Sequence, residues 1–426
     1  MIRWQRFAIV IFAFYGLFFS FSYAYDQEIK KETGSIALIN GTLIDGKSDI
    51  PIDNAAIIIT GEKIIAAGSL KDVRIPNNAE IINFKGRTVI PGLIDTHFHF
   101  TSAPSVSETL ADNDSMASFR AVHFLHRYLM VGVTTVRDVL SRHNVGIMAK
   151  KAYREGLFTG SRPIVVGMGI TCTGGHGTEY GSGRAIEADG PAEFRRAVRS
   201  QLKAGADLIK VLPPYSREEI EAAVEETHYY GRLITVHSGH SGLMLGEYED
   251  FVRWAVEAGA DCIEHAFAIP DDVIERMAEK KTYCVPTFHM MLWIADKVMK
   301  KNPGQEEKAE RWLNSVNIFK KMKKLGVRMG VGTDAVREDM AAYPGMYFDE
   351  IERFVEHGYT PMEAIQAATK VNAEISGIAD RLGTIEAGKL ADLLVIEGDP
   401  LQDIKALRQA KMIIQEGKII EQLSPY

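Results

Sequence analysis

Eight short apolar runs alternate with longer helical stretches through the middle of this chain, and this alternation limits the possible folds more than any other feature. The runs cover residues 89–99, 133–138, 163–167, 208–212, 233–237, 262–265, 283–287 and 328–334. Alternating strands and helices predict a parallel sheet with right-handed crossovers. Eight such units that close on themselves form a (β/α)8 barrel, so we predict an α/β fold with a TIM barrel over residues 91–382. A doubly wound open sheet is the alternative, but no glycine-rich dinucleotide loop follows the first run.

The stretches between the runs carry helix start and stop signals. A serine or threonine followed three residues later by glutamate forms a capping box, and such boxes begin at Ser216 and Thr360. Gly205, Gly259 and Gly326 follow helical stretches and suit the left-handed position that ends a helix. These signals support helices between the runs.

Short β-like runs with turn residues occupy both ends of the chain. Residues 35–90 contain several such runs, separated by Asn-Gly, Asp-Gly and Gly-Glu pairs, and residues 383–426 repeat the pattern. Closely spaced turn signals predict antiparallel β-structure. We expect a small β-sandwich built jointly from residues 35–90 and 383–426, with two unrelated edge extensions as the alternative.

Residues 1–24 have the pattern of a secretory signal peptide. Two arginines precede a nearly continuous apolar run, residues 7–21, and Ser22 and Ala24 are small residues at the −3 and −1 positions. We expect cleavage after Ala24, a linker over residues 25–34 and an exported protein. An uncleaved membrane anchor is the alternative, although the run is shorter than the ~20 residues that span a bilayer.

Composition narrows the range of partners. The 426 residues are 46% hydrophobic and 25% charged, with a net charge of −7 and no basic run, which argues against nucleic acid. Membrane contact is not expected once the signal is removed, and a homo-oligomer is compatible with the composition. The three cysteines are too few and odd in number for a disulfide framework, so we expect free thiols.

A His-x-His pair ends the first apolar run. Side chains two apart on a strand point to the same face, so His97 and His99 aim at one point at the strand's carboxyl end. Paired imidazoles suit zinc or another first-row metal ion, and a chance pair in a loop is the alternative. Further polar residues lie within or at the ends of later runs, where a barrel brings them to one mouth: Lys210, His237, His265 and Asp334.

Motifs in order along the chain resemble the amidohydrolase superfamily. They are PGLIDTHFH at residues 91–99, GADLIK at 205–210, IEH at 263–265, GTD at 332–334 and the closing stretch 383–393. The match covers essentially all of the chain after residue 24. Within the superfamily, the pattern is similar to the imidazolonepropionase-like branch that includes prolidase-like dipeptidases.

This resemblance implies a centre with two divalent metal ions, zinc being the first expectation. One ion would be held by His97, His99 and Asp334. The other would be held by His237 and His265. A carbamylated lysine would bridge the two ions, and the lysine at that position is Lys210.

Lys210 also has a physical argument of its own. Burial in a barrel mouth lowers the pKa of a lysine, because it disfavours the ammonium. The neutral amine can then add carbon dioxide to give a carbamate, whose two oxygens can hold two metal ions ~3.5–4 Å apart. A structural ion pair with an acidic neighbour is the alternative. In the implied mechanism a metal-bridging hydroxide attacks the carbonyl, and Asp334 passes its proton to the leaving nitrogen.

Three further residues are candidates for contacts with the substrate. His176 lies in the glycine-rich loop after the third run, where the resemblance implies a donor to the developing oxyanion or the substrate carbonyl. A turn-stabilising histidine is the alternative. Prolidase-like members are expected to have a tyrosine shortly after the fifth-run histidine, but this chain has His240 there. That departure makes His240 and Tyr215 candidate substrate contacts and weakens the case for Xaa-Pro specificity.

Together these inferences predict an exported, metal-dependent amidohydrolase that hydrolyses an amide or peptide C–N bond. Dipeptides of the Xaa-Pro kind and N-acyl amino acids are the expected substrates. A cyclic amide, carbamate or lactone hydrolase with the same metal ions is the first alternative. A non-catalytic scaffold is the second, and the retained ligand set argues against it, because a scaffold has no physical need for buried charges and imidazoles.

Overall fold

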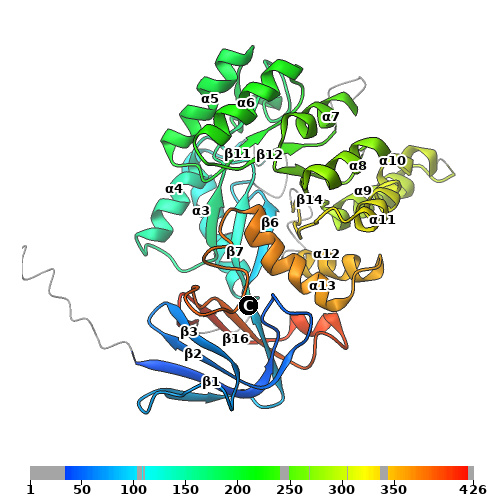
Figure 1. The fold of residues 1–426 in the computed structure, drawn as a ribbon. Coiled ribbons are helices and arrows are strands. Elements are labelled where there is room, and N and C mark those ends of the chain that lie inside the picture. Colours follow the sequence, from blue (N-terminus) through cyan, green and yellow to red (C-terminus); the bar gives the residue numbers. More distant parts are fainter. Residues whose placement is uncertain are drawn as a thin grey trace, which may run out of the picture.

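The computed structural model describes residues 34–102, 108, 111–239, 249–267, 269–304, 306–335 and 344–420. The chain has two parts (Figure 1): a sheet built from both ends of the chain, blue and red in the picture, and a larger α/β part above it. The largest cluster of buried apolar side chains fills the α/β part, and a second cluster lies on the sheet. The predicted signal peptide lies outside the described residues.

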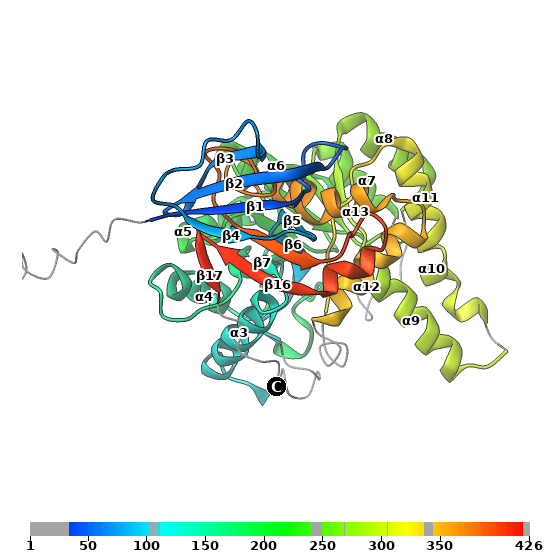
Figure 2. The same ribbon diagram turned by 90° about the horizontal axis from the view of Figure 1, so that it is seen from below.

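Eight strands form the sheet at one end of the molecule. They are β1 (Ser35–Leu43), β2 (Ile52–Thr60), β3 (Lys63–Ser69), β4 (Glu80–Asn83), β5 (Arg87–Pro91), β15 (Leu393–Glu397), β16 (Ala410–Gln415) and β17 (Lys418–Ile420). Their order is β17-β16-β15-β5-β1-β2-β3, and β4 pairs with β1. β5 and β15 run antiparallel with Ile90 opposite Leu394, so strands from the two ends of the chain lie side by side (Figure 2). The strands that we expected to form a sandwich are hydrogen-bonded to one another as one continuous sheet.

The α/β part contains two sheets whose strands pair in parallel. The three-stranded sheet has the order β6-β7-β8, and the six-stranded sheet has the order β10-β9-β11-β12-β13-β14. The strands are β6 (Leu93–Phe98), β7 (Val133–Asp138), β8 (Arg162–Val165), β9 (Gly169–Thr171), β10 (Ala185–Glu187), β11 (Ile209–Val211), β12 (Ile234–His237), β13 (Cys262–Glu264) and β14 (Tyr283–Val285). The α/β class and the parallel pairing predicted from the sequence are therefore present.

The first predicted run is divided between the two parts of the molecule. Residues 89–91 belong to β5 of the end sheet, and β6 begins at Leu93. Pro91, which has no N–H to donate, is the last residue of β5 and lies opposite Leu393. Gly92 donates its N–H to the carbonyl oxygen of Asp392. The chain therefore crosses from one sheet to the other at Pro91-Gly92.

The last predicted run, residues 328–334, forms isolated bridges instead of a strand. Met329 pairs with Cys284 of β14, and Ala335 pairs with Phe98 of β6. These bridges join the six-stranded sheet to the three-stranded sheet along one seam. The pairing of the described residues does not amount to a closed eight-stranded barrel, so the closed barrel stays a prediction.

Helices cover the parallel strands, and α9 to α11 project to the right in Figure 1. The α-helices are α3 (Asp114–Leu129), α4 (Val145–Arg154), α5 (Pro191–Ala204), α6 (Arg217–Tyr229), α7 (Glu249–Ala258), α8 (Asp271–Lys280), α9 (Phe288–Lys301), α10 (Glu310–Leu313), α11 (Ser315–Leu325), α12 (Gly345–Glu356), α13 (Pro361–Gln366) and α14 (Asn372–Ile375). Short helical turns are η1 (Glu179–Gly181), η2 (Glu306–Ala309), η4 (Ala367–Val371) and η5 (Ile404–Arg408). Within the described ranges, no helix has both the length and the apolar character needed to cross a membrane.

The predicted helix signals are confirmed. Ser216 and Thr360 each accept a hydrogen bond from the backbone of the glutamate three residues on, and each glutamate bonds back to the cap. Gly205 and Gly326 end α5 and α11 in the left-handed conformation. All three cysteines are free thiols.

A buried charged cluster ties the parallel strands to the end sheet. Arg162 of β8 donates to Asp392 at 2.6 Å and to Glu416 at 2.8 Å. Asp392 also accepts the backbone N–H of Glu416 at 2.8 Å. Arg162 and Asp392 are both buried, so neither charge has water to replace a lost partner.

We predict that Asp392→Ala lowers the free energy of unfolding by about 3 kcal/mol, because it leaves the buried guanidinium of Arg162 undercompensated. Chemical denaturation followed by circular dichroism measures the effect. Glu221→Ala is the matched control, since Glu221 pairs with Arg217 on the exposed face of α6, where such a pair contributes about 0.3–0.5 kcal/mol. Equal destabilisation by the two variants would contradict the role assigned to the cluster.

Candidate metal centre

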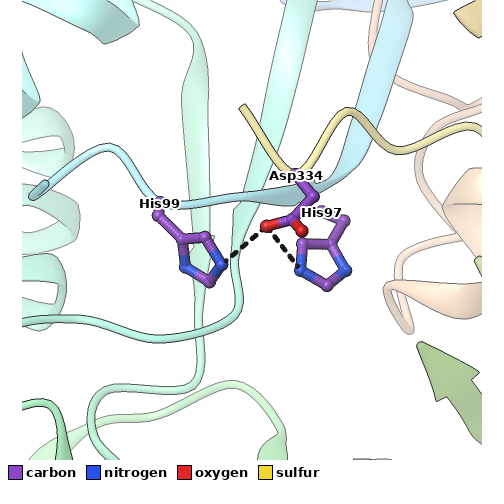
Figure 3. Close-up of side chains that lie close together, drawn as sticks. All are labelled: His97, His99 and Asp334. Atoms are coloured by element: carbon purple, nitrogen blue, oxygen red, sulfur yellow. Dashed lines mark ion pairs between the residues drawn. The ribbon is translucent and has the colours of Figure 1, made fainter. Parts of the chain in front are cut away.

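Three of the sequence-predicted ligands meet at one point, as Figure 3 shows. The carboxylate oxygen Oδ1 of Asp334 lies 3.4 Å from Nε2 of His97 and 3.2 Å from Nε2 of His99. One ligand atom from each of the three residues lies within 4.8 Å of the others. Both histidines are buried. Two imidazoles and a carboxylate at this spacing form a ligand set that suits a first-row divalent ion.

Backbone contacts bring Asp334 to the end of β6. The N–H of Asp334 donates to the carbonyl oxygen of His97 at 2.7 Å. Asp95, which is buried in β6, accepts the N–H of His97 at 3.0 Å and the hydroxyl of Thr333 at 2.8 Å. Burial raises the pKa of Asp95 to about 7. One side chain of β6 therefore fixes the segments that carry His97 and Asp334.

A second pair of histidines lies beside the first group. Nδ1 of His237, at the end of β12, is 2.9 Å from Nε2 of His265, which follows β13. Nδ1 of His265 is 2.8 Å from the hydroxyl of Thr287 and 3.9 Å from Oδ2 of Asp334. The rings of His97 and His265 are 4.7 Å apart between centroids. The structure thus brings together all five of the predicted histidine and aspartate ligands.

Lys210 of β11 is a lysine inside the core. It is only 2% exposed, and its Nζ has no hydrogen-bond partner among the described residues. Burial lowers the pKa of Lys210 to about 8, against the opposing attraction of Glu264. A substantial fraction of neutral amine is therefore present near neutral pH. The alternative of a structural ion pair is not seen in the described part of the chain.

Glu264 and Arg137 are the functional residues that sequence reasoning missed. Oε2 of Glu264 lies 2.7 Å from Nδ1 of His97, and Oε1 accepts from Arg137 at 2.5 Å. Burial alone would raise the pKa of Glu264, but Arg137 together with Lys210 and His97 holds that pKa well below its usual value. An ionised carboxylate only accepts hydrogen bonds, so Nδ1 of His97 carries a hydrogen, and Nε2 is the ring nitrogen on the side of Asp334. The sequence signal for these two residues was a charged side chain inside a buried strand, because a buried charge needs a partner.

The protonation states of the site fit a divalent ion. Burial lowers the pKa of His99 to about 4. Burial also lowers the pKa values of His237 and His265 well below the usual value, with neighbouring histidines adding to the effect. Burial would raise the pKa of Asp334, but His97 and His99 hold it well below its usual value. His99, His237 and His265 are thus neutral beside an ionised Asp334, and these are the metal-binding forms of these groups. Burial acts to lower the pKa of His97, but the carboxylates of Glu264 and Asp334 outweigh burial and raise it.

The remaining predicted site residues fall in three different places. The ring of His176 lies 4.7 Å from that of His237, which puts it beside the second histidine pair. Tyr215 is 3% exposed, and its hydroxyl donates to the carbonyl oxygen of Phe251 in α7 at 2.8 Å. Its hydroxyl is thus bonded within the core, and the expected contact of Tyr215 with a substrate stays a prediction. His240 lies outside the described residues.

Comparisons with known proteins agree with the resemblance found in the sequence motifs. Residues 88–420 match the model of the amidohydrolase family. The ochratoxinase of Aspergillus niger is 28% identical, over 89% of this chain and 84% of its own length. A crystal structure of a Xaa-Pro dipeptidase with bound methionine is 30% identical, with a TM-score of 0.79 over 91% of this chain and 100% of the dipeptidase chain. A prolidase complexed with N-methylphosphonate-L-proline is 26% identical, with a TM-score of 0.77 over 91% of this chain and 100% of the prolidase chain. As its motifs predicted, the chain belongs to the amidohydrolase family, and it is a hydrolase that acts on carbon–nitrogen bonds.

Proposed function

We propose that this protein is an exported, metal-dependent amidohydrolase that cleaves dipeptides of the Xaa-Pro kind or N-acyl amino acids. One observation carries the proposal: His97, His99 and Asp334 offer ligand atoms within 4.8 Å of one another, next to the His237–His265 pair. Similarity to solved Xaa-Pro dipeptidase and prolidase structures supports an amide substrate with a free carboxylate. Similarity to an ochratoxinase also supports hydrolysis of a carbon–nitrogen bond, although in a different substrate.

The residues of the site have distinct roles in the proposed reaction. Divalent ions held by the histidines and Asp334, with zinc as the first choice, supply Lewis acidity that activates water and polarises an amide carbonyl. Asp334 accepts a proton from the attacking water and delivers it to the leaving nitrogen, since its carboxylate is ionised and lies at the centre of the group. His176 donates to the oxygen of the substrate carbonyl as negative charge develops there. Glu264 keeps His97 in the orientation that ligation requires.

The test is metal analysis paired with a hydrolysis panel of dipeptides, N-acyl amino acids, cyclic amides, carbamates and lactones. We expect about two divalent ions per chain and turnover of the first two classes, lost on chelation and restored by zinc. Asp334→Asn should keep its metal and lose at least about 100-fold in kcat, because the amide oxygen can still bind a cation but cannot take a proton.

Three outcomes would contradict this proposal. An Asp334→Asn variant that turns over at near the wild-type rate would remove the assigned proton carrier. Hydrolysis confined to cyclic amides, carbamates or lactones would favour the alternative substrate class. Protein that binds no divalent ion and cleaves nothing in the panel would favour a non-catalytic scaffold.

We also propose that Lys210 carries a carbamate that bridges the two ions. The neutral amine adds carbon dioxide and releases one proton, and the buried, unpartnered Nζ supports this chemistry. Protein equilibrated with 13C-bicarbonate should show a carbamate 13C resonance that Lys210→Met lacks. Lys150→Met is the matched control and should keep the resonance, because Nζ of Lys150 is bonded to Asp207 at 2.7 Å. A resonance that survives in Lys210→Met would refute the assignment.

Export is proposed from the N-terminal sequence alone. Two arginines, an apolar run and small residues before position 25 support cleavage after Ala24. Mass spectrometry of the protein recovered outside the cytoplasm should give a chain that starts at Tyr25. Recovery of the full-length chain in the membrane fraction would favour the uncleaved anchor.

A further inference from the structure

We propose that Glu179 is a positioning residue that fixes the hydrogen on Nδ1 of His176 and thereby presents Nε2 of that histidine to the substrate. This inference rests on the proposed function, in which His176 contacts the substrate carbonyl. It concerns a residue with no part in the metal-ligand set, on the loop between β9 and β10.

Hydrogen bonds to the carbonyl oxygen of Pro213 anchor this loop. The N–H of His176 donates to the carbonyl oxygen of Pro213 at 3.0 Å, and the hydroxyl of Thr171 donates to the same oxygen at 3.3 Å. Pro213 lies just after β11, the strand that carries Lys210. The Cα of His176 is therefore held relative to the site, and the main freedom left is rotation of its ring.

The carboxylate of Glu179 removes that freedom. Its Oε1 lies 2.7 Å from Nδ1 of His176, and its Oε2 accepts the N–H of Gly177 at 2.7 Å. Gly177 has a φ of +92°, a conformation that favours glycine. Both oxygens are thus used, one on the ring and one on the neighbouring backbone. Burial acts to raise the pKa of Glu179, but the bonds from His176 and Gly177 lower it to about 2, so the carboxylate is charged.

The direction of these bonds decides which nitrogen of His176 is available. A charged carboxylate only accepts, so Nδ1 must carry a hydrogen. Nε2 is then the nitrogen left for the substrate, on a ring 4.7 Å from that of His237. Donation from Nε2 requires a second hydrogen on the ring, and the carboxylate of Glu179 at 2.7 Å from Nδ1 would offset the positive charge that this hydrogen brings. Removing that carboxylate should weaken the transition state more than the ground state.

Glu179→Gln tests this arrangement with little change of shape. The N–H of Gly177 can bond only to the amide oxygen of glutamine, which turns the amide NH2 toward Nδ1 of His176. Two donors cannot face each other, so the ring must lose the hydrogen from Nδ1. In 15N spectra of histidine-labelled, metal-loaded protein, we expect Nδ1 of His176 to carry a hydrogen in the wild type and none in Glu179→Gln.

Kinetics give an independent readout. We expect kcat of Glu179→Gln to fall at least about tenfold with KM within about twofold, since loss of the carboxylate beside the His176 ring weakens donation to the developing oxyanion more than it weakens binding. Adding Glu179→Gln to His176→Ala should cause no further loss, because Glu179 acts through that ring. Glu187→Gln is the matched control: Glu187 accepts the N–H of Gly174 in the same loop at 2.8 Å and, among the described contacts, has no hydrogen bond to His176, so it should leave kcat unchanged.

The outcomes separate this inference from the proposed function. An Nδ1 of His176 without a hydrogen in the wild type would overturn the inference, even if Glu179→Gln failed to fold. A kcat of Glu179→Gln equal to that of Glu187→Gln would overturn it as well. Protein that cleaves nothing in the panel but shows the switch at Nδ1 would refute the proposed function and leave the assignment of Glu179 supported.

Discussion

The buried carboxylate of Glu264 is the contact on which the geometry of the site depends. It bonds to Arg137 of β7 and Thr235 of β12, and its other oxygen faces Nδ1 of His97 on β6 at 2.7 Å. Removing one partner of such a buried pair costs about 3–5 kcal/mol, because the remaining charge is uncompensated. Any arrangement that separates these strands is therefore strongly disfavoured. The group that orients the His97 imidazole is the same group that holds four strands of the α/β part together.

Strained backbone at two strand ends turns the ligands toward this point. His265 and Asp334 have φ values of 74° and 48°, and such conformations cost about 1–3 kcal/mol each in residues other than glycine. Backbone hydrogen bonds of 2.7 Å from His265 to Val285 and from Asp334 to His97 offset this cost. Both residues sit where the chain leaves a strand or a bridge, so a small change of φ there redirects a side chain without disturbing the sheet. At these two positions the strain sets the direction of a ligand side chain.

The strands and the ligand positions could be predicted because strand geometry turns spacing into direction. A His-x-His pair on a strand, and polar residues at the ends of successive strands, had to converge if the strands were parallel. The partner of Glu264 could not be predicted, since a buried charged residue shows that a partner exists but not which strand supplies it. Tyr215 shows the same limit: its hydroxyl turns to α7 because of how that helix packs, which no local pattern encodes. The last run lies very close to β6, where a Cβ on Gly332 would be 2.7 Å from the Cβ of His97, and such a close approach is not readable from the local pattern.

Buried polar atoms also distinguish a catalytic centre from a scaffold on energetic grounds. Among the described residues, Nδ1 of His99, Nε2 of His237 and Nζ of Lys210 have no hydrogen-bond partner. Each unsatisfied buried group costs about 1–3 kcal/mol, and apolar side chains of similar size would avoid that cost. A chain selected only for stability would therefore replace these residues. Cation binding by neutral imidazoles and an ionised Asp334 offsets the same cost, since ions that bind only the folded state stabilise it. The features that destabilise the fold at this site are those that suit a metal ion, so under the proposed function the stability of the protein and its chemistry would be coupled through one set of side chains.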